Sequence, residues 1–368
     1  VVSHGSNIFG GKLVGRTGGV HRLEGTFTTG ELEMTGGDVH GVGSLHVEGD
    51  VVWTGGRFLG NGETLFKGSV SLSGLDDKVV DGRTIQLAHT GTTTWTGGAI
   101  KILGEARIVN FGTFLDQTAG GQLLRDDDLP AGGGFDNRGT FHKLGTALTD
   151  GLTTFGVTLT SKAGAILKID AGNLTLQGGS ELGGTVTVAN GAALTLAGVA
   201  AHHIDSMVGT ASLGQLVMAA HVTVQGVNDF GGMLVLASGT QTLEGSLTTD
   251  QLSLNGADLT GSGSLTGKGS FTWGSGRFLG NGSTRFEGTA SLHGPSDKVV
   301  NQRVIELAGT TTWTGGAIKA SGDGRYLNTG TFLDQTSNGQ MLRDASLPGT
   351  GSFHNAGMYR KTSGRSDL

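Results

Sequence analysis

Short runs of alternating apolar and polar residues recur along the whole chain. Examples are Leu65–Leu72, Leu174–Leu176, Thr185–Val188 and Ala193–Leu196. Alternation with a period of two is typical of a β-strand that has one buried face and one solvent-facing face. Gly-Gly, Asn-Gly and Ser-Gly steps separate the runs, and glycine readily adopts the positive φ that tight corners need. The pattern therefore predicts many short strands joined by tight corners, with no linker between them.

The runs are organised in a long repeat. Residues 1–147 reappear as residues 222–368, and the window Trp95–Thr118 matches Trp313–Thr336 at 17 of 24 positions. We assign residues 1–221 to a first complete repeat unit and residues 222–368 to a second, incomplete unit that continues the same structure. A long period made of short strands is typical of a solenoid.

A finer period lies inside the long one. Trp53 and Trp95 are 42 residues apart, and Trp273 and Trp313 are 40 apart, which fits two turns of about 20–21 residues each. A motif of the form Asn-x-Gly-Thr/Met-Phe/Tyr occurs twice in each copy, at a somewhat longer and constant spacing. A turn of about 20–27 residues is the size of one coil in a single-stranded parallel β-helix, whose strands stack about 4.8 Å apart. The prediction is an all-β solenoid of about 16 coils, forming a rod on the order of 80 Å long.

Composition supports this fold class. Glycine makes up 71 of the 368 residues and proline only 3, while 36% of residues are apolar. Collagen needs abundant proline and a strict glycine period, a disordered chain would lack the alternating apolar runs, and a helix would be weakened by each interior glycine. All-β structure is the class that remains.

Charge and cysteine content exclude some partners and leave the compartment open. The net charge is −6, which offers no basis for nucleic-acid binding. No apolar run approaches the roughly 18 residues of a bilayer-spanning helix. The chain has no cysteine, which fits a secreted protein but also occurs in the cytosol. It opens without a methionine or a signal peptide and stops inside a repeat, so we expect a longer parent protein.

Four asparagines begin the Asn-x-Gly motifs: Asn110, Asn137, Asn328 and Asn355. Asparagine tolerates corner conformations, and its amide can bond to an asparagine on the next coil, which builds a ladder. The aromatic residue at the end of each motif is expected to pack inside. We interpret these asparagines as structural corner residues.

All four tryptophans, Trp53, Trp95, Trp273 and Trp313, precede glycine-containing corners. Exposed indole faces would stack on sugar rings, whereas buried ones would fill the coil interior ahead of the corner. We favour the structural interpretation and keep glycan binding as an alternative.

The most chemically suggestive residues are carboxylates. Asp116 is followed by Asp126, Asp127 and Asp128, and the second copy retains Asp334 and Asp344. Such a group is able to serve a polysaccharide lyase or hydrolase, or to bind calcium. However, Ala345 and Ser346 replace Asp127 and Asp128 in the second copy. We therefore favour a loop ion pair of these aspartates with Arg125 or Arg343.

Two further ideas receive little support. His202, His203 and Asp205 are able to bind a metal only at a bend, because neighbouring residues on a strand point to opposite faces. Thr-x-Thr pairs of the kind found on ice-binding faces do not recur at one coil period. We expect no metal, no cofactor and no catalytic residue.

The run Gly91–Gly98, repeated at Gly309–Gly316, together with the downstream Asn-x-Gly-Thr-Phe motif, resembles repeats of very large bacterial surface proteins. These are autotransporter passengers and adhesins of the filamentous-haemagglutinin type. The resemblance implies a right-handed parallel β-helix, export to the cell surface, and a role in adhesion, matrix or filament formation. It supplies no catalytic residues.

We therefore expect a non-catalytic structural segment of a large secreted or cell-surface repeat protein. Its expected partners are further repeats or copies joined end to end, and cell-surface glycans; nucleic acid and membrane insertion are not expected. The alternatives are a β-helical enzyme acting on polysaccharide and a glycan-binding adhesin that uses the tryptophan motifs.

Overall fold

The protein is an all-β solenoid. The computed structural model describes residues 1–124, 133–145, 151–209, 214–343 and 350–367, with the backbone alone for Arg343 and residues 365–367. Strands account for 64% of residues, the described ranges contain no helix, and the parallel strands stack into about 15 turns. This confirms the predicted fold class. In the same ranges, no helix has the length and apolarity that crossing a bilayer requires.

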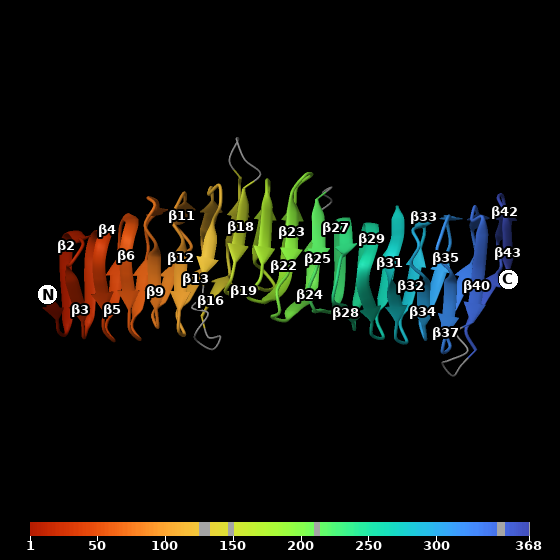
Figure 1. Cartoon of the computed structure of the whole chain (residues 1–368). Coiled ribbons are helices and arrows are strands. Elements are labelled where there is room, and N and C mark those ends of the chain that lie inside the picture. Colours follow the sequence, from red (N-terminus) through yellow and green to blue (C-terminus); the bar gives the residue numbers. More distant parts are fainter. Residues whose placement is uncertain (125–132, 146–150, 210–213, 344–349, 368) are drawn as a thin grey trace. The chain divides into compact units, whose positions relative to one another are not determined.

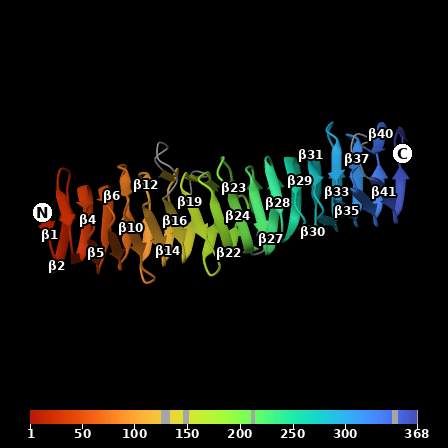
Figure 2. The same ribbon diagram turned by 90° about the horizontal axis from the view of Figure 1, so that it is seen from below.

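The chain divides into two compact units, residues 1–194 and residues 195–368. This division is separate from the sequence repeat, which restarts at residue 222. Within each unit, successive coils lie next to one another in sequence order (Figure 1), and the view turned by 90° shows the same order (Figure 2).

In unit 1, equivalent strands of successive coils pair in parallel and form three stacks. Stack 1 contains the starts of β2 (Ser6–Gly15) and β4 (Thr26–His40), then β5 (Ser44–Val47), β7 (Glu63–Phe66), β10 (Thr84–Leu87), β13 (Arg107–Asn110), β16 (Gly134–Asn137), β19 (Thr158–Ser161) and the start of β22 (Ser180–Val188). Stack 2 contains later parts of β2, β4 and β22, the start of β6 (Val51–Leu59), and β8 (Val70–Leu72), β11 (Thr92–Trp95), β14 (Thr113–Asp116), β17 (Thr140–Lys143) and β20 (Ile166–Ile169). Stack 3 contains β1 (Val2–Ser3), β3 (Val20–Leu23), the ends of β4 and β6, β9 (Lys78–Asp81), β12 (Ile100–Leu103), β15 (Gln122–Leu124), β18 (Leu152–Phe155) and β21 (Asn173–Leu176). The last strand, β23 (Ala193–Leu196), contains the residue at which the units divide.

Unit 2 repeats the three stacks. Stack 1 contains the end of β24 (His202–Gly209), the starts of β27 (Val227–Leu236) and β29 (Ser246–Thr260), β30 (Ser264–Gly267), β32 (Ser283–Phe286), β35 (Val304–Leu307), β38 (Arg325–Asn328) and β41 (Ser352–Asn355). Stack 2 contains β25 (Gln215–Met218), later parts of β27 and β29, the start of β31 (Phe271–Leu279), β33 (Thr289–Leu292), β36 (Thr310–Trp313), β39 (Thr331–Asp334) and β42 (Met358–Lys361). Stack 3 contains the start of β24, β26 (Val222–Gln225), β28 (Thr240–Leu243), the ends of β29 and β31, β34 (Lys298–Asn301), β37 (Ile318–Ser321), β40 (Asn338–Arg343) and β43 (Arg365–Asp367).

Coil length varies more than the sequence period indicated. Thr26 pairs with Ser44 of the next coil, whereas Ile108 pairs with the much more distant Phe135. The longer of these two coils agrees with the upper bound of the predicted range, and the shorter one falls below its lower bound. The short coils occur where long strands such as β4 bend directly from one stack to the next, so the corners contain few residues.

Side chains alternate between the interior and solvent along each short strand. In β7 and β10, the second and fourth residues are buried and the residues between them are partly exposed. Leu174–Leu176 and Ala193–Leu196 follow the predicted alternation. The run Leu65–Leu72 does not form the single strand that its pattern predicts. It contains the end of β7, a corner and β8. At this corner the chain passes from stack 1 to stack 2, and after Gly68 alternate residues again face the interior.

Corners depend on glycine where coils approach closely. Gly98 and Gly316 follow equivalent tryptophans and have φ of 70° and 73°. A side chain at either position would collide with a backbone carbonyl of the preceding coil, that of Asp76 or that of Ser296. These corners therefore exclude other residues for both conformational and steric reasons.

Candidate functional site inside the coils

The four tryptophans lie inside the solenoid. Trp95 and Trp313 are 0% exposed, and Trp53 and Trp273 are at most 2% exposed. The indole nitrogen of Trp95 donates to the carbonyl of Gly98 at 2.9 Å, and that of Trp313 donates to Gly316 at 2.8 Å. The enclosed rings present no face on which a sugar ring can stack. All four tryptophan rings therefore lie in the interior of the coils.

Trp53 differs from the other three in its polar contact. Trp273 donates to Gly276 at 3.1 Å, whereas the indole nitrogen of Trp53 has no hydrogen-bond partner in the described part of the chain. Both rings pack edge-on against a phenylalanine of the same strand, Phe58 or Phe278. Ring packing is therefore what the two sites share.

A polar column follows the tryptophan on stack 2 of each unit. Strand pairing places Trp95 beside Asp116, and Asp116 beside Lys143. In unit 2, Trp313 lies beside Asp334 in the same way, and Asp334 beside Lys361. Stack 2 thus contains one inward-facing carboxylate and one inward-facing amine at matching positions of the two copies.

In unit 1 the acidic and basic groups of this column are completely enclosed. The side chains of Asp116 and Lys143 are both 0% exposed, and Lys143 Nζ lies 3.4 Å from Asp116 Oδ2. Thr153 Oγ1 donates to Asp116 Oδ2 at 2.5 Å and accepts from Lys143 Nζ at 2.9 Å. The other carboxylate oxygen, Oδ1, accepts from Thr118 N at 2.9 Å and from Thr118 Oγ1 at 2.7 Å. We call Asp116, Lys143, Thr118 and Thr153 the first interior cluster.

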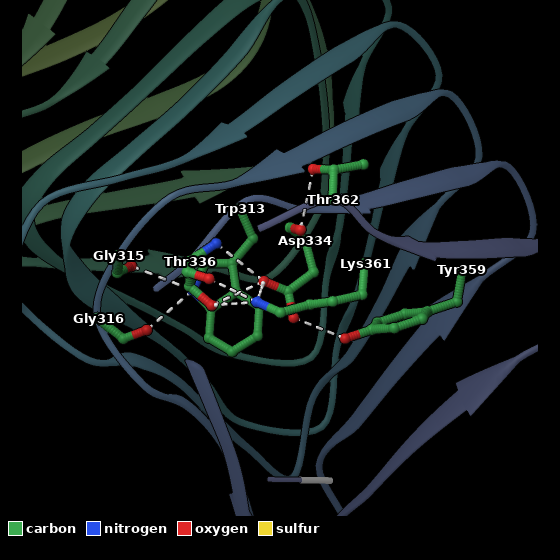
Figure 3. A network of polar contacts seen from close by, with 8 residues as sticks. All are labelled: Trp313, Gly315, Gly316, Asp334, Thr336, Tyr359, Lys361 and Thr362. Atoms are coloured by element: carbon green, nitrogen blue, oxygen red, sulfur yellow. Dashed lines mark hydrogen bonds and ion pairs between the residues drawn. The ribbon is translucent and has the colours of Figure 1, made fainter. Parts of the chain in front are cut away.

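The second interior cluster consists of Asp334, Lys361, Thr336 and Tyr359. Figure 3 shows the Asp334 carboxylate with the Lys361 amine and the Tyr359 hydroxyl directed at it. Lys361 Nζ donates to Oδ1 at 2.9 Å, and Tyr359 donates to Oδ2 at 2.7 Å. Thr336 N and Oγ1 donate to Oδ1 at 3.0 and 2.7 Å. Lys361 is 24% exposed, so this cluster is less enclosed than the first.

The loop ion pair predicted with Arg125 or Arg343 falls on side chains outside the described residues, as do Asp126, Asp127, Asp128 and Asp344. Asp116 and Asp334 are the candidate aspartates that the structure describes. Asp116 lies in the interior beside Lys143, and both carboxylates are 0% exposed.

The asparagines form short ladders across neighbouring coils. Asn110 Nδ2 donates to Asn137 Oδ1 at 2.9 Å, and Asn137 Nδ2 continues to Ser161 Oγ at 3.2 Å. Asn328 Nδ2 donates to Asn355 Oδ1 at 2.6 Å in unit 2. Asn110, Asn137 and Asn328 are almost fully buried, and Asn355 is exposed. Side-chain amides of neighbouring coils are thus joined at equivalent positions in the two copies.

Each ladder has a defined first member. Leu87 precedes Asn110 in the strand register, and Leu307 precedes Asn328. The leucine side chain has no N–H donor, and within the described residues the Oδ1 atoms of Asn110 and Asn328 are both buried without a hydrogen-bond partner. The ladder therefore starts at the same place in each copy, with one unsatisfied oxygen.

Replacing Asn137 by alanine is expected to lower the free energy of unfolding by about 1–3 kcal/mol, because the buried Asn110 amide loses its acceptor. Asn137 also donates to the carbonyl of Ile166 at 3.0 Å, and that bond is lost too. Asn355→Ala is the matched control: it removes the equivalent acceptor from Asn328, but Asn355 is exposed, so water takes its place and the cost falls below about 1 kcal/mol. Denaturant midpoints of the two variants measure the difference, and equal midpoints contradict a stabilising role for the buried ladder.

Two buried arginines were not found by sequence reasoning. Arg83 and Arg303 are 0% exposed and occupy equivalent corners. Arg83 donates to the Thr64 hydroxyl at 2.8 Å and to four backbone carbonyls, with Gly43 at 2.7 Å and Glu63 at 2.8 Å as the shortest contacts. Arg303 makes the same set of contacts. Burial lowers the pKa of each guanidinium to about 10.

Two buried lysines donate hydrogen bonds to backbone carbonyls at corners. Lys78 Nζ donates to the carbonyls of Asp76 and Gly97, both at 2.8 Å. Its counterpart Lys298 donates to the carbonyls of Gly274 and Ser296. Burial lowers the pKa of both amines. The sequence signal was the recurrence of Asp-Lys-Val-Val, in which the lysine shares the phase of the second, buried valine.

The histidine candidates point in opposite directions. His202 is buried in β24 with Nε2 3.0 Å from the carbonyl oxygen of Ala197, while His203 and Asp205 are exposed. Desolvation lowers the pKa of His202. Among the described residues, no group of three or more histidine, aspartate or glutamate side chains is arranged to hold a metal ion.

Comparison with protein-family models, with curated proteins and with solved structures gives no match. The fold and the interior contacts are therefore the observations on which a function must be argued.

Proposed function

We propose that this chain is a non-catalytic structural segment of a large secreted or cell-surface repeat protein. In this proposal its coils form a rigid rod or fibre for adhesion, matrix or filament assembly. The observation that carries the proposal is what the two copies share. The repeated side chains lie inside the coils, where they fill the interior or form hydrogen bonds between neighbouring coils. They are the tryptophans, the asparagine ladders, the buried arginines and lysines, and the interior clusters.

Contacts that join coils on the outside are repeated as well. Arg57 binds Asp38 of the preceding coil through two bonds of 2.7 Å, and Arg277 binds Asp258 in the same bidentate way. Lys101 and Lys319 pair with Asp77 and Asp297, each at 2.6 Å. Each exposed pair contributes at most about 1 kcal/mol. Their recurrence along the stacking direction supports a role in holding successive coils together.

Small-angle scattering tests the rod. About 15 turns stacked at about 4.8 Å give a length on the order of 70 Å. The expected result is the scattering curve of a rod with a constant cross-section. A compact, near-spherical particle contradicts the proposal.

The enzymatic alternative is tested by incubating the protein with a panel of acidic polysaccharides and measuring the release of reducing ends. We expect no release, because Asp116 and Asp334 are enclosed and already hydrogen-bonded. Release that disappears in Asp116→Asn would favour the enzyme over the structural segment.

End-to-end association with further repeats or copies is the partner that we propose. At one face of unit 1, β2 leaves Phe9 48% exposed, whereas its counterpart Phe230, which has a coil on either side, is 1% exposed. An uncovered inward-facing apolar residue at a strand edge of this kind accepts another coil. Sedimentation is expected to show concentration-dependent oligomers that Phe9→Lys abolishes. Lys67→Glu on the side of the coils is the control, and monomers at all concentrations would contradict the association.

A further inference from the structure

We propose that Lys143 and Asp116 condense to form an isopeptide bond inside unit 1, and that Lys361 and Asp334 form the equivalent bond in unit 2. Each bond would join neighbouring parallel strands covalently, β14 to β17 and β39 to β42. The inference goes beyond the proposed function, because a structural rod needs only ion pairs in these positions.

The amine is held against the carboxyl group in a site that excludes water. Both side chains of the first pair are 0% exposed, and the Nζ–Oδ2 distance is 3.4 Å. The neighbouring inward-facing residues Phe114 and Phe141 are stacked with ring centroids 5.6 Å apart. Desolvation makes an amine a better nucleophile, and fixed proximity replaces the entropy cost of an encounter between two groups. An enclosed site also protects the amide from hydrolysis.

One carboxylate oxygen is surrounded as an oxyanion would be. Asp116 Oδ1 accepts from the backbone N–H and the hydroxyl of Thr118 at 2.9 and 2.7 Å. Two donors at this range are the arrangement that stabilises a tetrahedral intermediate of acyl transfer. Asp334 Oδ1 has the same two donors from Thr336, at 3.0 and 2.7 Å.

The other oxygen has a route by which it receives protons. Thr153 Oγ1 lies between Lys143 Nζ, at 2.9 Å, and Asp116 Oδ2, at 2.5 Å, and already accepts from the first and donates to the second. This hydroxyl relays a proton from the amine to the leaving oxygen. In the second cluster, the Tyr359 hydroxyl donates to Asp334 Oδ2 at 2.7 Å and is placed to protonate that oxygen.

The reaction balances without any further reactant. Lys143 Nζ starts as an ammonium group and first passes one proton through Thr153 Oγ1 to Asp116 Oδ2, which gives a neutral amine and a carboxylic acid. The amine then attacks Asp116 Cγ while negative charge develops on Oδ1. The Nζ–Cγ bond forms, the Cγ–Oδ2 bond breaks, and Oδ2 leaves as water with two protons from Nζ. One proton remains on the amide nitrogen. The product removes two buried charges, each of which costs several kcal/mol to desolvate.

The test is the intact mass of the full chain under denaturing conditions. The expected mass is lower than the sequence mass by one water for each bond. Trypsin is then expected to release a branched peptide in which residues 108–125 are joined to residues 139–162 through Asp116 and Lys143. The second bond joins residues 326–343 to residues 361–365. The unmodified sequence mass, together with unlinked peptides ending at Lys143, overturns the proposal.

Variants identify the bond and the relay. Lys143→Arg is expected to restore one water to the mass and to leave the second branched peptide intact, while the exposed Lys168→Arg changes neither bond. Thr153→Val is expected to lower the cross-linked fraction several-fold, and Thr153→Ser to restore it. A deficit of two waters that persists in Lys143→Arg contradicts the assignment of the first bond. Because the native chain alone gives the primary result, a variant that does not fold leaves the test decisive.

Discussion

Replacing Arg83 by methionine is expected to lower the free energy of unfolding by at least about 3 kcal/mol. Methionine fills much of the space but supplies none of the five donors. Four backbone carbonyls and the Thr64 hydroxyl then lose a charged partner in a buried site. A buried acceptor left without a partner costs about 1–3 kcal/mol, and relaxation of the coil recovers part of the total. The measurement is the denaturant midpoint of the full chain.

Arg57→Met is the matched control for this prediction. Arg57 also makes a bidentate contact, but with the partly exposed Asp38, and its own side chain is 54% exposed. Its loss is expected to cost no more than about 1 kcal/mol. Arg303→Met is expected to repeat the effect of Arg83→Met, because the same contacts recur in unit 2. Equal losses in the free energy of unfolding for Arg57→Met and Arg83→Met would show that the contacts of the buried arginine do not stabilise the fold.

The burial of Arg83 and Arg303 could not be predicted from the sequence. Arg83 lies in a corner after Gly82, where no strand phase applies, and its donors reach carbonyls 40 and 42 residues earlier in the chain. A contact of that reach depends on how coils of different length are stacked. Recurrence of an arginine at both corners was visible, but recurrence alone does not distinguish a surface charge from a buried one.

The interior clusters would have been easier to predict from the sequence than the buried arginines. The motif aromatic Phe114 was expected to face inward, and a period of two then places Asp116 inward as well. The same rule places Lys143 inward after Phe141. Applying strand phase to charged residues would therefore have predicted a buried Asp–Lys pair. We favoured instead a loop ion pair of the aspartates with Arg125 or Arg343, whose side chains lie outside the described residues, and did not consider Lys143, which faces Asp116 from the next coil.

Fold class, strand alternation and the asparagine ladders followed from the sequence because each depends on local chemistry repeated at coil spacing. Glycine steps mark corners, alternation marks strands, and asparagines that begin successive motifs align in register on neighbouring coils. The continuous strand expected over Leu65–Leu72 failed for a related reason. The buried residues before and after Gly68 fall on the same alternate positions of the sequence. The pattern therefore did not show that the chain turns a corner there and passes to another stack.

Trp95→Ala is expected to lower the free energy of unfolding by about 3–5 kcal/mol. The indole is 0% exposed and packs edge-on near Phe114 with centroids 6.3 Å apart, so its loss leaves a cavity in the middle of stack 2. The bond to the Gly98 carbonyl is lost as well. Val52→Ala, on a strand of the same stack but 39% exposed, is expected to cost no more than about 1 kcal/mol. Denaturant midpoints measure both.

A double-mutant cycle separates packing from a general loss of order. A side chain at Gly121 would lie 2.6 Å from the Trp95 ring, so Gly121→Ala is expected to destabilise the native chain. In the Trp95→Ala chain the ring is gone and the added methyl group enters the vacated space, so the same substitution is expected to cost less. Residues in direct contact typically show coupling energies of about 0.5–3 kcal/mol. Strictly additive costs would mean that the indole does not occupy the space beside Gly121. The equivalent pair, Trp313 and Gly339, is separated by 2.7 Å on the same measure and should give a coupling of the same sign, because the second copy repeats this packing.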